Sequence, residues 1–406
     1  MSGDTDGPAP SHVRPVARRA VFHIGGYERN DAPHFFGRLD RELERFRACW
    51  SVSATLGPVS VDGPEAATAL LAYDDGVRRT ETELTFLDYD DLVAEEGKRS
   101  LARRLDDYVT AFFDYVISGT AFRFFRANWR FGLFFLYPAL GFFAPLLVGY
   151  AVWAALQAPP GTGAALAAVA LGLAVALLPI WFMVRRMFLF HMKGLWIAGS
   201  DFARGRGMRF ERRLERWADI VERRLADGRF DEVVFVGHSF GGALVLDLAA
   251  RHAARVVEAG GVPRFNILTA GSTAPMVFMH PFARAARDHL GFLAAQRGVW
   301  WVDAQALIDP INFFRCDPLS LAGVSNPRSE PFPMVFEVRI RDMVDPHFYG
   351  SMKYNIFRVH YQFVSANTRR YGYDYAMMCF GPMPITHAVE RAVNARPFDP
   401  TSPDLS

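Results

Sequence analysis

Two long stretches without a charged residue, 131–156 and 164–183, constrain this chain more than any other feature. Each reaches the roughly 20 helical residues that cross a bilayer core of about 30 Å. The Pro and Gly residues of the segment 157–163 end one helix and turn the chain back. Because helices buried in a soluble core rarely run this far without a charge, the sequence predicts a transmembrane helical hairpin.

Basic residues lie on both sides of the predicted hairpin, whereas the loop between its helices carries no charge. They are Arg123, Arg126 and Arg130 before the first helix, and Arg185, Arg186 and Lys193 after the second. The positive-inside rule therefore predicts that both flanks are cytoplasmic and can fold together as one domain. Residues 1–19 are polar and basic, so no cleavable signal peptide is expected there.

The composition argues against several classes of protein. A formal charge of +2 is too small for binding that rests on phosphate neutralisation, so no nucleic-acid partner is expected. The isolated Cys49, Cys316 and Cys379 support neither a disulfide framework nor a metal site, and they fit a reducing compartment. Lysine is rare while arginine and alanine abound, which is typical of a GC-rich bacterial genome. We therefore expect a multi-pass protein of the bacterial inner (cytoplasmic) membrane.

Outside the hairpin, apolar runs alternate with helical stretches, which indicates an α/β fold with a mostly parallel sheet flanked by helices. The expected strands are 20–24, 50–55, 83–87, 232–237, 264–271, 299–302 and 333–340, with a loop between the second and third. The expected helices are 33–48, 101–116, 210–225, 242–257 and 281–296. The expected organisation is a tail at 1–19, a domain formed by 20–121 and 193–390, the hairpin region 122–192, and a tail at 391–406.

The chemistry is expected where the strand 232–237 meets the following helix. Gly237-His-Ser-Phe-Gly241 fits the pattern G-x-S-x-G, in which a serine sits at the tip of a tight strand-to-helix turn. The turn is strained, so the residues two positions away must lack bulk, and Gly237 and Gly241 meet that need. Ser239 is the predicted nucleophile, and His238 is interpreted as its packing neighbour rather than its base.

This elbow, with its strand and helix, resembles the α/β-hydrolase superfamily, and the spacing of the later motifs is somewhat similar to that of the class 3 (triacylglycerol) lipases. The resemblance covers about 20–90 and 205–380 and is most specific at 237–242. It implies an α/β-hydrolase-type sheet interrupted by the hairpin. It also implies that an acid follows a later strand and that a histidine follows the strand after that.

Three aspartates can fill the acid position. Asp309 is preferred, because an Asp-Pro turn beyond the strand 299–302 holds a carboxylate at the carboxyl edge of the sheet, where it can accept from a histidine. Asp303, at the strand end, and Asp317, in a similar Asp-Pro pair, remain open.

Three histidines, His360, His347 and His387, follow the last strand and are candidates for the base. His360 is preferred, because the lipase resemblance implies a histidine that begins a helical segment well after that strand. His347 is nearer in sequence and would serve if the loop is short.

The oxyanion hole needs backbone N–H donors aimed at the developing charge. One normally comes from the residue after the nucleophile, which is Phe240 here. The second is expected from the loop after the first strand, where His23-Ile-Gly-Gly-Tyr27 resembles the family's His-Gly motif with an insertion. Gly26 or Tyr27 is then the donor.

These residues predict a membrane-anchored serine hydrolase that cleaves carboxylic esters through a Ser-His-Asp triad, without metal or organic cofactor. Tethering to the membrane favours an acyl-ester or lipid substrate, because such molecules are concentrated there. Acyl transfer and thioester or peptide hydrolysis would use the same triad, so they stay open. An inactive hydrolase-fold scaffold, a channel and a homo-oligomer are further alternatives.

Overall fold

The computed structural model describes residues 14–156, 161–186, 189–206 and 208–394. Within them, one mixed sheet has the strand order β2-β4-β5-β1-β6-β7-β8-β9, with β3 paired to β4. The pairings from β5 through β1 to β9 are parallel, and those of β4 with β2, β3 and β5 are antiparallel. The predicted α/β class with a mostly parallel sheet flanked by helices is therefore confirmed.

The strands are β1 (Arg18–Ile24), β2 (Ser53–Leu56), β3 (Ser60–Val61), β4 (Ala66–Asp74), β5 (Arg79–Leu87), β6 (Glu232–His238), β7 (Phe265–Ala270), β8 (Val299–Gln305) and β9 (Met334–Glu337). The helices before and through the hairpin are α1 (Ala32–Trp50), α2 (Asp90–Gly97), α3 (Leu101–Ile117), α4 (Thr120–Ala127), α5 (Trp129–Ala155), α6 (Gly163–Arg186) and α7 (Leu189–Ala203). Those after it are α8 (Met208–Leu225), α9 (Gly241–Glu258), α10 (Ala274–Phe278), α11 (Arg284–Ala295), α12 (Pro318–Ala322), α13 (Ile340–Met343), α14 (Pro346–Met352), α15 (Ile356–Tyr361), α16 (Tyr375–Phe380) and α17 (Ile385–Asn394).

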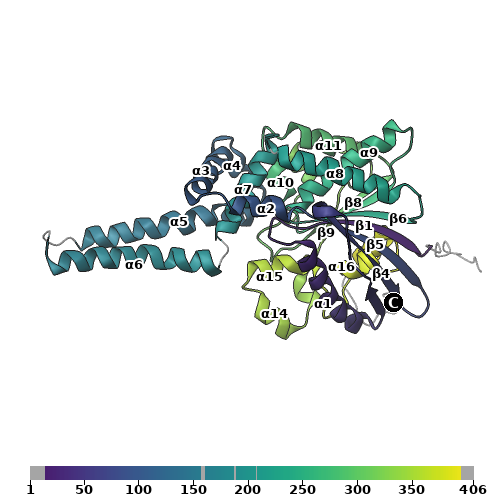
Figure 1. Ribbon diagram of the computed structural model, residues 1–406, viewed down its shortest axis with the longest axis horizontal. Coiled ribbons are helices and arrows are strands. Elements are labelled where there is room, and N and C mark those ends of the chain that lie inside the picture. The colour runs from purple at the N-terminus through teal and green to yellow at the C-terminus, as the bar shows by residue number, and fades with distance from the viewer. Residues whose placement is uncertain (1–13, 157–160, 187–188, 207, 395–406) are drawn as a thin grey trace, which may run out of the picture.

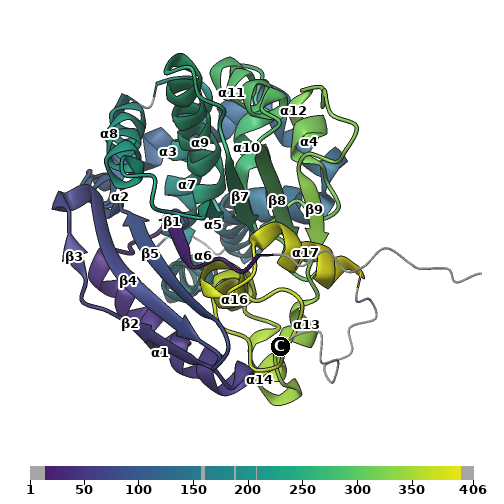
Figure 2. The same ribbon diagram turned by 90° about the vertical axis from the view of Figure 1, so that its right-hand side faces the viewer.

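The central strand β1 is buried on both faces and divides the apolar core in two. Ala20, Phe22 and Ile24 join the core formed with α8 and α9, whereas Val21 joins the core formed with α1 and α16. This alternation follows from the twofold repeat of a strand, which sends successive side chains to opposite faces. Figures 1 and 2 show the two helical layers, α8 to α11 on one face of the sheet and α1 with α14 to α16 on the other.

The prediction of a loop between 55 and 83 is wrong, because β3, β4 and half of β5 lie there. β4 buries its first four residues in succession and alternate residues after them, but three of the first four are alanines, which carry little hydrophobic signal. Gly, Pro and Asp residues surround the strand and suggest a loop on local grounds alone. Pairing with β5 over nine residues overrides that local preference.

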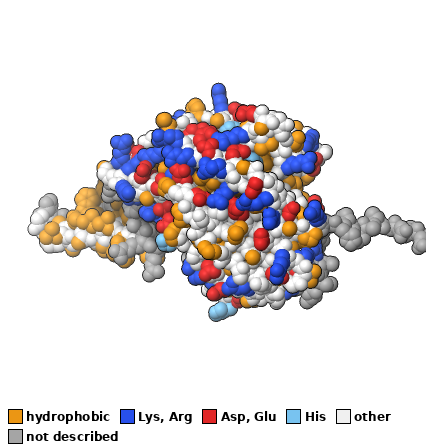
Figure 3. All heavy atoms as spheres, turned by 45° about the vertical axis from the view of Figure 1, so that its right-hand side comes forward, with side chains coloured by type: hydrophobic (Ala, Val, Ile, Leu, Met, Phe, Trp, Pro, Cys, Tyr) orange, Lys and Arg blue, Asp and Glu red, His pale blue; other side chains and the backbone are white. Residues whose placement is uncertain are grey.

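Helices α5 and α6 form an antiparallel hairpin that projects from the domain (Figure 1). Both are long and apolar enough to cross a membrane. Many of their large side chains are not covered by protein, and Leu147, Leu166 and Leu178 are each more than 60% exposed. Figure 3 shows the apolar surface of the hairpin beside a domain surface covered with charges. This apolar exposure is typical of helices that contact lipid or another apolar partner.

The root of the hairpin is fixed to the domain by one polar cluster. Asp114 of α3 accepts hydrogen bonds from Ser200 Oγ at 2.5 Å and from the Arg204 guanidinium, both residues lying on α7 or its C-terminal end. His280, after α10, places its Nε2 atom 3.2 Å from the same carboxylate. Asp114 therefore joins the helices before and after the hairpin to the layer above the sheet.

Candidate active site

Ser239 occupies the predicted turn between β6 and α9. Its φ is +56°, a left-handed conformation that is strained for a residue with a side chain. The turn requires glycine at positions 237 and 241, because other backbone segments approach both positions too closely for a side chain. A Cβ added at Gly237 would lie 2.6 Å from the Gly241 carbonyl oxygen. One added at Gly241 would collide with the carbonyl oxygens of Ile24 and Gly25. The local sequence thus permits a serine at the carboxyl edge of the central strands.

His360 and Asp309 form a buried hydrogen-bonded pair, in which His360 Nδ1 donates to Asp309 Oδ2 over 2.7 Å. Both side chains are at most 5% exposed. An ionised carboxylate only accepts, so the hydrogen bond places a proton on Nδ1. Asp309 is itself oriented, because its Oδ1 accepts from the Ile311 amide at 2.9 Å and its carbonyl accepts from Asn312 at 2.7 Å.

Ser239 and His360 line the same cavity, whose volume is about 370 Å³. The Nε2 atom of His360 is buried and has no hydrogen-bond partner among the described residues. The structure has no hydrogen bond between Ser239 and His360, although a general base often approaches its serine only in the complex.

His238 lies against His360, with ring centroids 4.6 Å apart, and its Nε2 donates to the His360 carbonyl at 3.2 Å. Burial lowers its pKa well below 6.5, and the neighbouring His360 lowers it further. The His238 ring is therefore neutral, and its hydrogen bond to the His360 carbonyl helps to position the backbone there.

The other acid candidates point elsewhere. Asp303 lies within β8 rather than after it, because the strand continues to Gln305. Its oxygens accept from Thr269 Oγ1 at 2.5 Å and from Gln305 Nε2 at 2.6 Å, and burial raises its pKa to about 7. Asp317 caps the first turn of α12 through the Leu319 amide at 2.9 Å.

The other base candidates also lie outside the cavity. His347 is exposed on α14, and His387 is half-buried on α17. His360 does not begin a helix as expected, because it lies in the last turn of α15, which Asn355 caps at its start.

The candidate oxyanion residues lie on two segments that meet at Ser239. Phe240 immediately precedes the N-terminus of the 18-residue helix α9, where amides and the helix dipole favour negative charge. A Cβ added at Gly26 would lie 3.5 Å from Ser239 Oγ, so the loop after β1 faces the nucleophile. The Tyr27 hydroxyl donates to the Glu96 carboxylate, and its ring packs edge-on against Phe240 with centroids 5.9 Å apart.

No sequence motif marks the cavity wall, which combines residues from distant segments. Phe134 comes from the first hairpin helix, Leu195 from α7, and Ile311, Phe357 and Tyr361 from the C-terminal half. Glu28 and Arg29, next to Tyr27, complete it. The only sequence signal for these was the position of Glu28 and Arg29 beside the predicted oxyanion loop.

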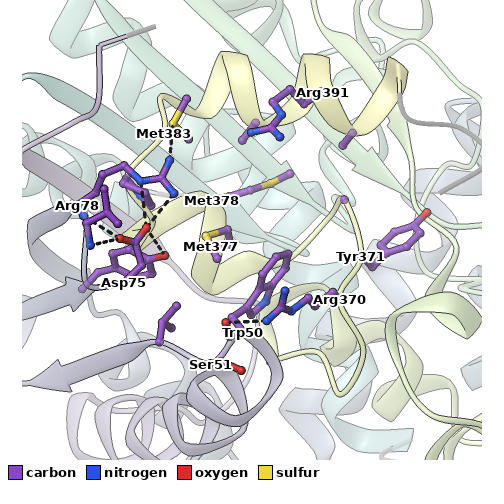
Figure 4. Close-up of a pocket in the computed structure, with 17 residues that line it drawn as sticks. Trp50, Ser51, Asp75, Arg78, Arg370, Tyr371, Met377, Met378, Met383 and Arg391 are labelled. Carbon is purple, nitrogen blue, oxygen red and sulfur yellow. Dashed lines mark hydrogen bonds and ion pairs between the residues drawn. The ribbon is translucent and has the colours of Figure 1, made fainter. Parts of the chain in front are cut away.

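A larger cavity of about 630 Å³ lies at the opposite end of the parallel strands, between the end of α1, the β4–β5 turn and the C-terminal helices (Figure 4). Asp75 and Arg78 pair with each other across 2.9 Å, and Arg370 donates to the Trp50 carbonyl at 3.0 Å. These polar groups satisfy one another, and none of the predicted site residues lies there.

No group of three or more His, Cys, Asp or Glu residues that could hold a metal ion occurs in the part of the chain that the structure describes. No protein-family model, curated protein or solved structure matches the chain.

Proposed function

We propose that this protein is a membrane-anchored serine hydrolase of the α/β-hydrolase type that cleaves carboxylic esters. The observation that carries the proposal is the Asp309–His360 hydrogen bond of 2.7 Å in the cavity where Ser239 occupies a strained strand-to-helix turn. The three residues come from separate segments, and their types match a nucleophile, a base and an orienting acid, which supports the proposal.

In the proposed mechanism, Ser239 Oγ attacks the ester carbonyl while His360 Nε2 takes its proton. Asp309 keeps Nδ1 protonated and stabilises the imidazolium that forms. The amides of Phe240 and of Gly26 or Tyr27 bind the oxyanion of the tetrahedral intermediate. His360 then protonates the leaving alcohol, and an acyl-enzyme remains on Ser239. Water, deprotonated by His360, releases the carboxylic acid and restores the serine.

A lipid ester is the favoured substrate, because the cavity adjoins the root of the hairpin. Phe134 lies in the second turn of α5 and forms part of the cavity wall. If α5 and α6 cross the bilayer with both flanks in the cytoplasm, the site lies at the membrane surface, where lipid esters are concentrated.

A fluorophosphonate probe tests the nucleophile, since it reports an activated serine without a known substrate. The detergent-solubilised wild type should label, Ser239→Ala should not, and the exposed Ser351→Ala on α14 should label like wild type. A folded wild type that fails to label, or a Ser239→Ala variant that still labels, contradicts the proposal.

The base is tested separately with a soluble ester. His360→Ala should abolish turnover, whereas His347→Ala, on the exposed surface of α14, should retain it. Loss of turnover in the second variant alone would move the base to His347.

A further inference from the structure

Glu28 lines the cavity of Ser239 and His360, yet its side chain has no hydrogen-bond or ion-pair partner among the described residues. The adjacent Arg29 differs, because its guanidinium binds Asp90 at 2.8 Å. Burial raises the pKa of Glu28 to about 7, and the nearby Arg38 and His360 lower it only partly. A buried carboxyl without a hydrogen-bond partner is costly, and a ligand that donates to it removes that cost.

Arg38 of α1 lies over the ring of a residue that lines the cavity. Its guanidinium carbon is 4.8 Å from the centroid of the Tyr361 ring, and Tyr361 lines the same cavity. Within the described ranges, Arg38 donates no hydrogen bond and has no carboxylate within 4.0 Å, so Glu28 and Arg38 do not pair directly. Burial lowers the pKa of Arg38.

Glu28 and Arg38 therefore lie beside one cavity, each poorly solvated, and they attract each other without a direct hydrogen bond or ion pair. A ligand that carries a cation and an anion would satisfy both charges at once. A neutral glyceride would leave both unpaired, and a purely anionic head would bind Arg38 but be repelled by Glu28.

We propose that Glu28 and Arg38 bind the polar head of the substrate, Glu28 its ammonium group and Arg38 its phosphate. The inference rests on the proposed function. It names the substrate class as zwitterionic amine-bearing glycerophospholipids rather than neutral glycerides. Water would cleave one acyl ester, with the fatty acid leaving from Ser239 and the lysophospholipid as the alcohol product.

Binding is measured first in the Ser239→Ala background, which prevents turnover. The probes are lysophosphatidylethanolamine, lysophosphatidylglycerol and monoacylglycerol with the same fluorescent acyl chain, each in detergent micelles and followed by anisotropy. We expect the ethanolamine lipid to bind at least about tenfold more tightly than the other two, since a charged hydrogen bond in a desolvated site has that effect.

Two variants separate the roles of the charges. Glu28→Gln should remove the preference for the ethanolamine head over the glycerol head, and Arg38→Met should remove the preference of both phospholipids over monoacylglycerol. Their controls are Glu44→Gln and Arg41→Met, which lie on the exposed side of α1 and should change nothing.

The outcomes distinguish the two proposals. Equal binding of all three lipids, or an equal effect of Glu28→Gln on each, overturns the head-group site. If the Ser239→Ala variant binds head groups selectively but the wild type hydrolyses no ester, the head-group site stands and the proposed hydrolase activity is overturned. If the wild type hydrolyses esters but binding shows no head-group preference, the hydrolase activity stands and the head-group site is overturned.

Discussion

Gly26 and Ser239 lie so close that a Cβ added to the glycine would be 3.1 Å from the Cβ of the serine. One residue comes from the loop after β1 and the other from the turn after β6, which pairs with β1 in parallel. The contact brings the predicted oxyanion loop against the nucleophile.

We expect Gly26→Ala to lower kcat/KM for a soluble ester roughly tenfold to a hundredfold, because the methyl group displaces Ser239 or the loop from the reactive geometry. Thermal unfolding should show that the variant is folded. Gly97→Ala in α2 is the control, since its added Cβ meets nothing within 4 Å. Equal activity of Gly26→Ala and wild type would argue against the proposed oxyanion loop.

Asp309→Asn should lower kcat by about 10⁴-fold, because the amide no longer holds the Nδ1–H tautomer of His360. The matched variant Asp303→Asn should leave kcat close to wild type, since Asp303 bonds to Thr269 and Gln305 and not to a histidine. Steady-state kinetics with the same ester measure both. A larger loss of kcat in Asp303→Asn than in Asp309→Asn would assign the role of orienting acid to Asp303.

Asp303 also predicts a pH-dependent stability. Its pKa is about 7 in the folded protein and near 3.8 when unfolded, so between these values the folded state holds a proton that the unfolded state releases. Its contribution to the free energy of unfolding therefore falls as pH rises from about 4 to about 7 and is constant beyond.

Relative to Asp303→Asn, wild type should lose stability over that pH range, by on the order of 4 kcal/mol at most. Melting temperatures of both proteins at pH 4.5 and pH 8 measure the difference. A difference that stays the same at the two pH values would contradict the prediction.

Asp114→Asn should destabilise the protein by about 1–3 kcal/mol, because it weakens bonds to Ser200 and Arg204 at the root of the hairpin. A lower melting temperature in detergent is the expected readout. Asp106→Asn, exposed on the same helix, serves as control and should melt like wild type. Matching melting temperatures for the two variants would show that the cluster contributes little.

The proposed topology predicts which engineered cysteines react from outside intact cells. In a background with Cys49 and Cys316 changed to serine, Thr162→Cys between the hairpin helices should react with a membrane-impermeant maleimide. Ser351→Cys on α14 should react only after lysis, and the remaining Cys379 is fully buried. If only Ser351→Cys reacts in intact cells, the topology is the opposite of the proposed one.

The sequence predicted best where one strong local pattern dominates. Charge-free length marked α5 and α6, and the apolar run before Ser239 marked β6, because a buried parallel strand needs no other signal. β4 was not predicted, because its alanines give little local strand signal and the strand is stabilised by pairing with β5.

The turn that holds Ser239 was predictable from the sequence, but the side chains that surround it were less so. G-x-S-x-G combines a local turn with a reactive residue, whereas the choice among Asp303, Asp309 and Asp317 depends on where β8 ends. Arg38 and Phe134 had no signal, because their proximity to the cavity arises only from tertiary packing, and Glu28 had only its position beside the predicted oxyanion loop.

The place of the hairpin in the chain couples membrane insertion to completion of the sheet. β1 pairs with β5 before the hairpin and with β6 after it. During synthesis, the N-terminal half therefore keeps an open, apolar edge until the ribosome has delivered both hairpin helices. If those helices enter the bilayer as proposed, Gly26 meets Ser239 only in a chain already integrated into the membrane, so a misdirected nascent chain would have no assembled nucleophile with which to attack esters in the cytosol.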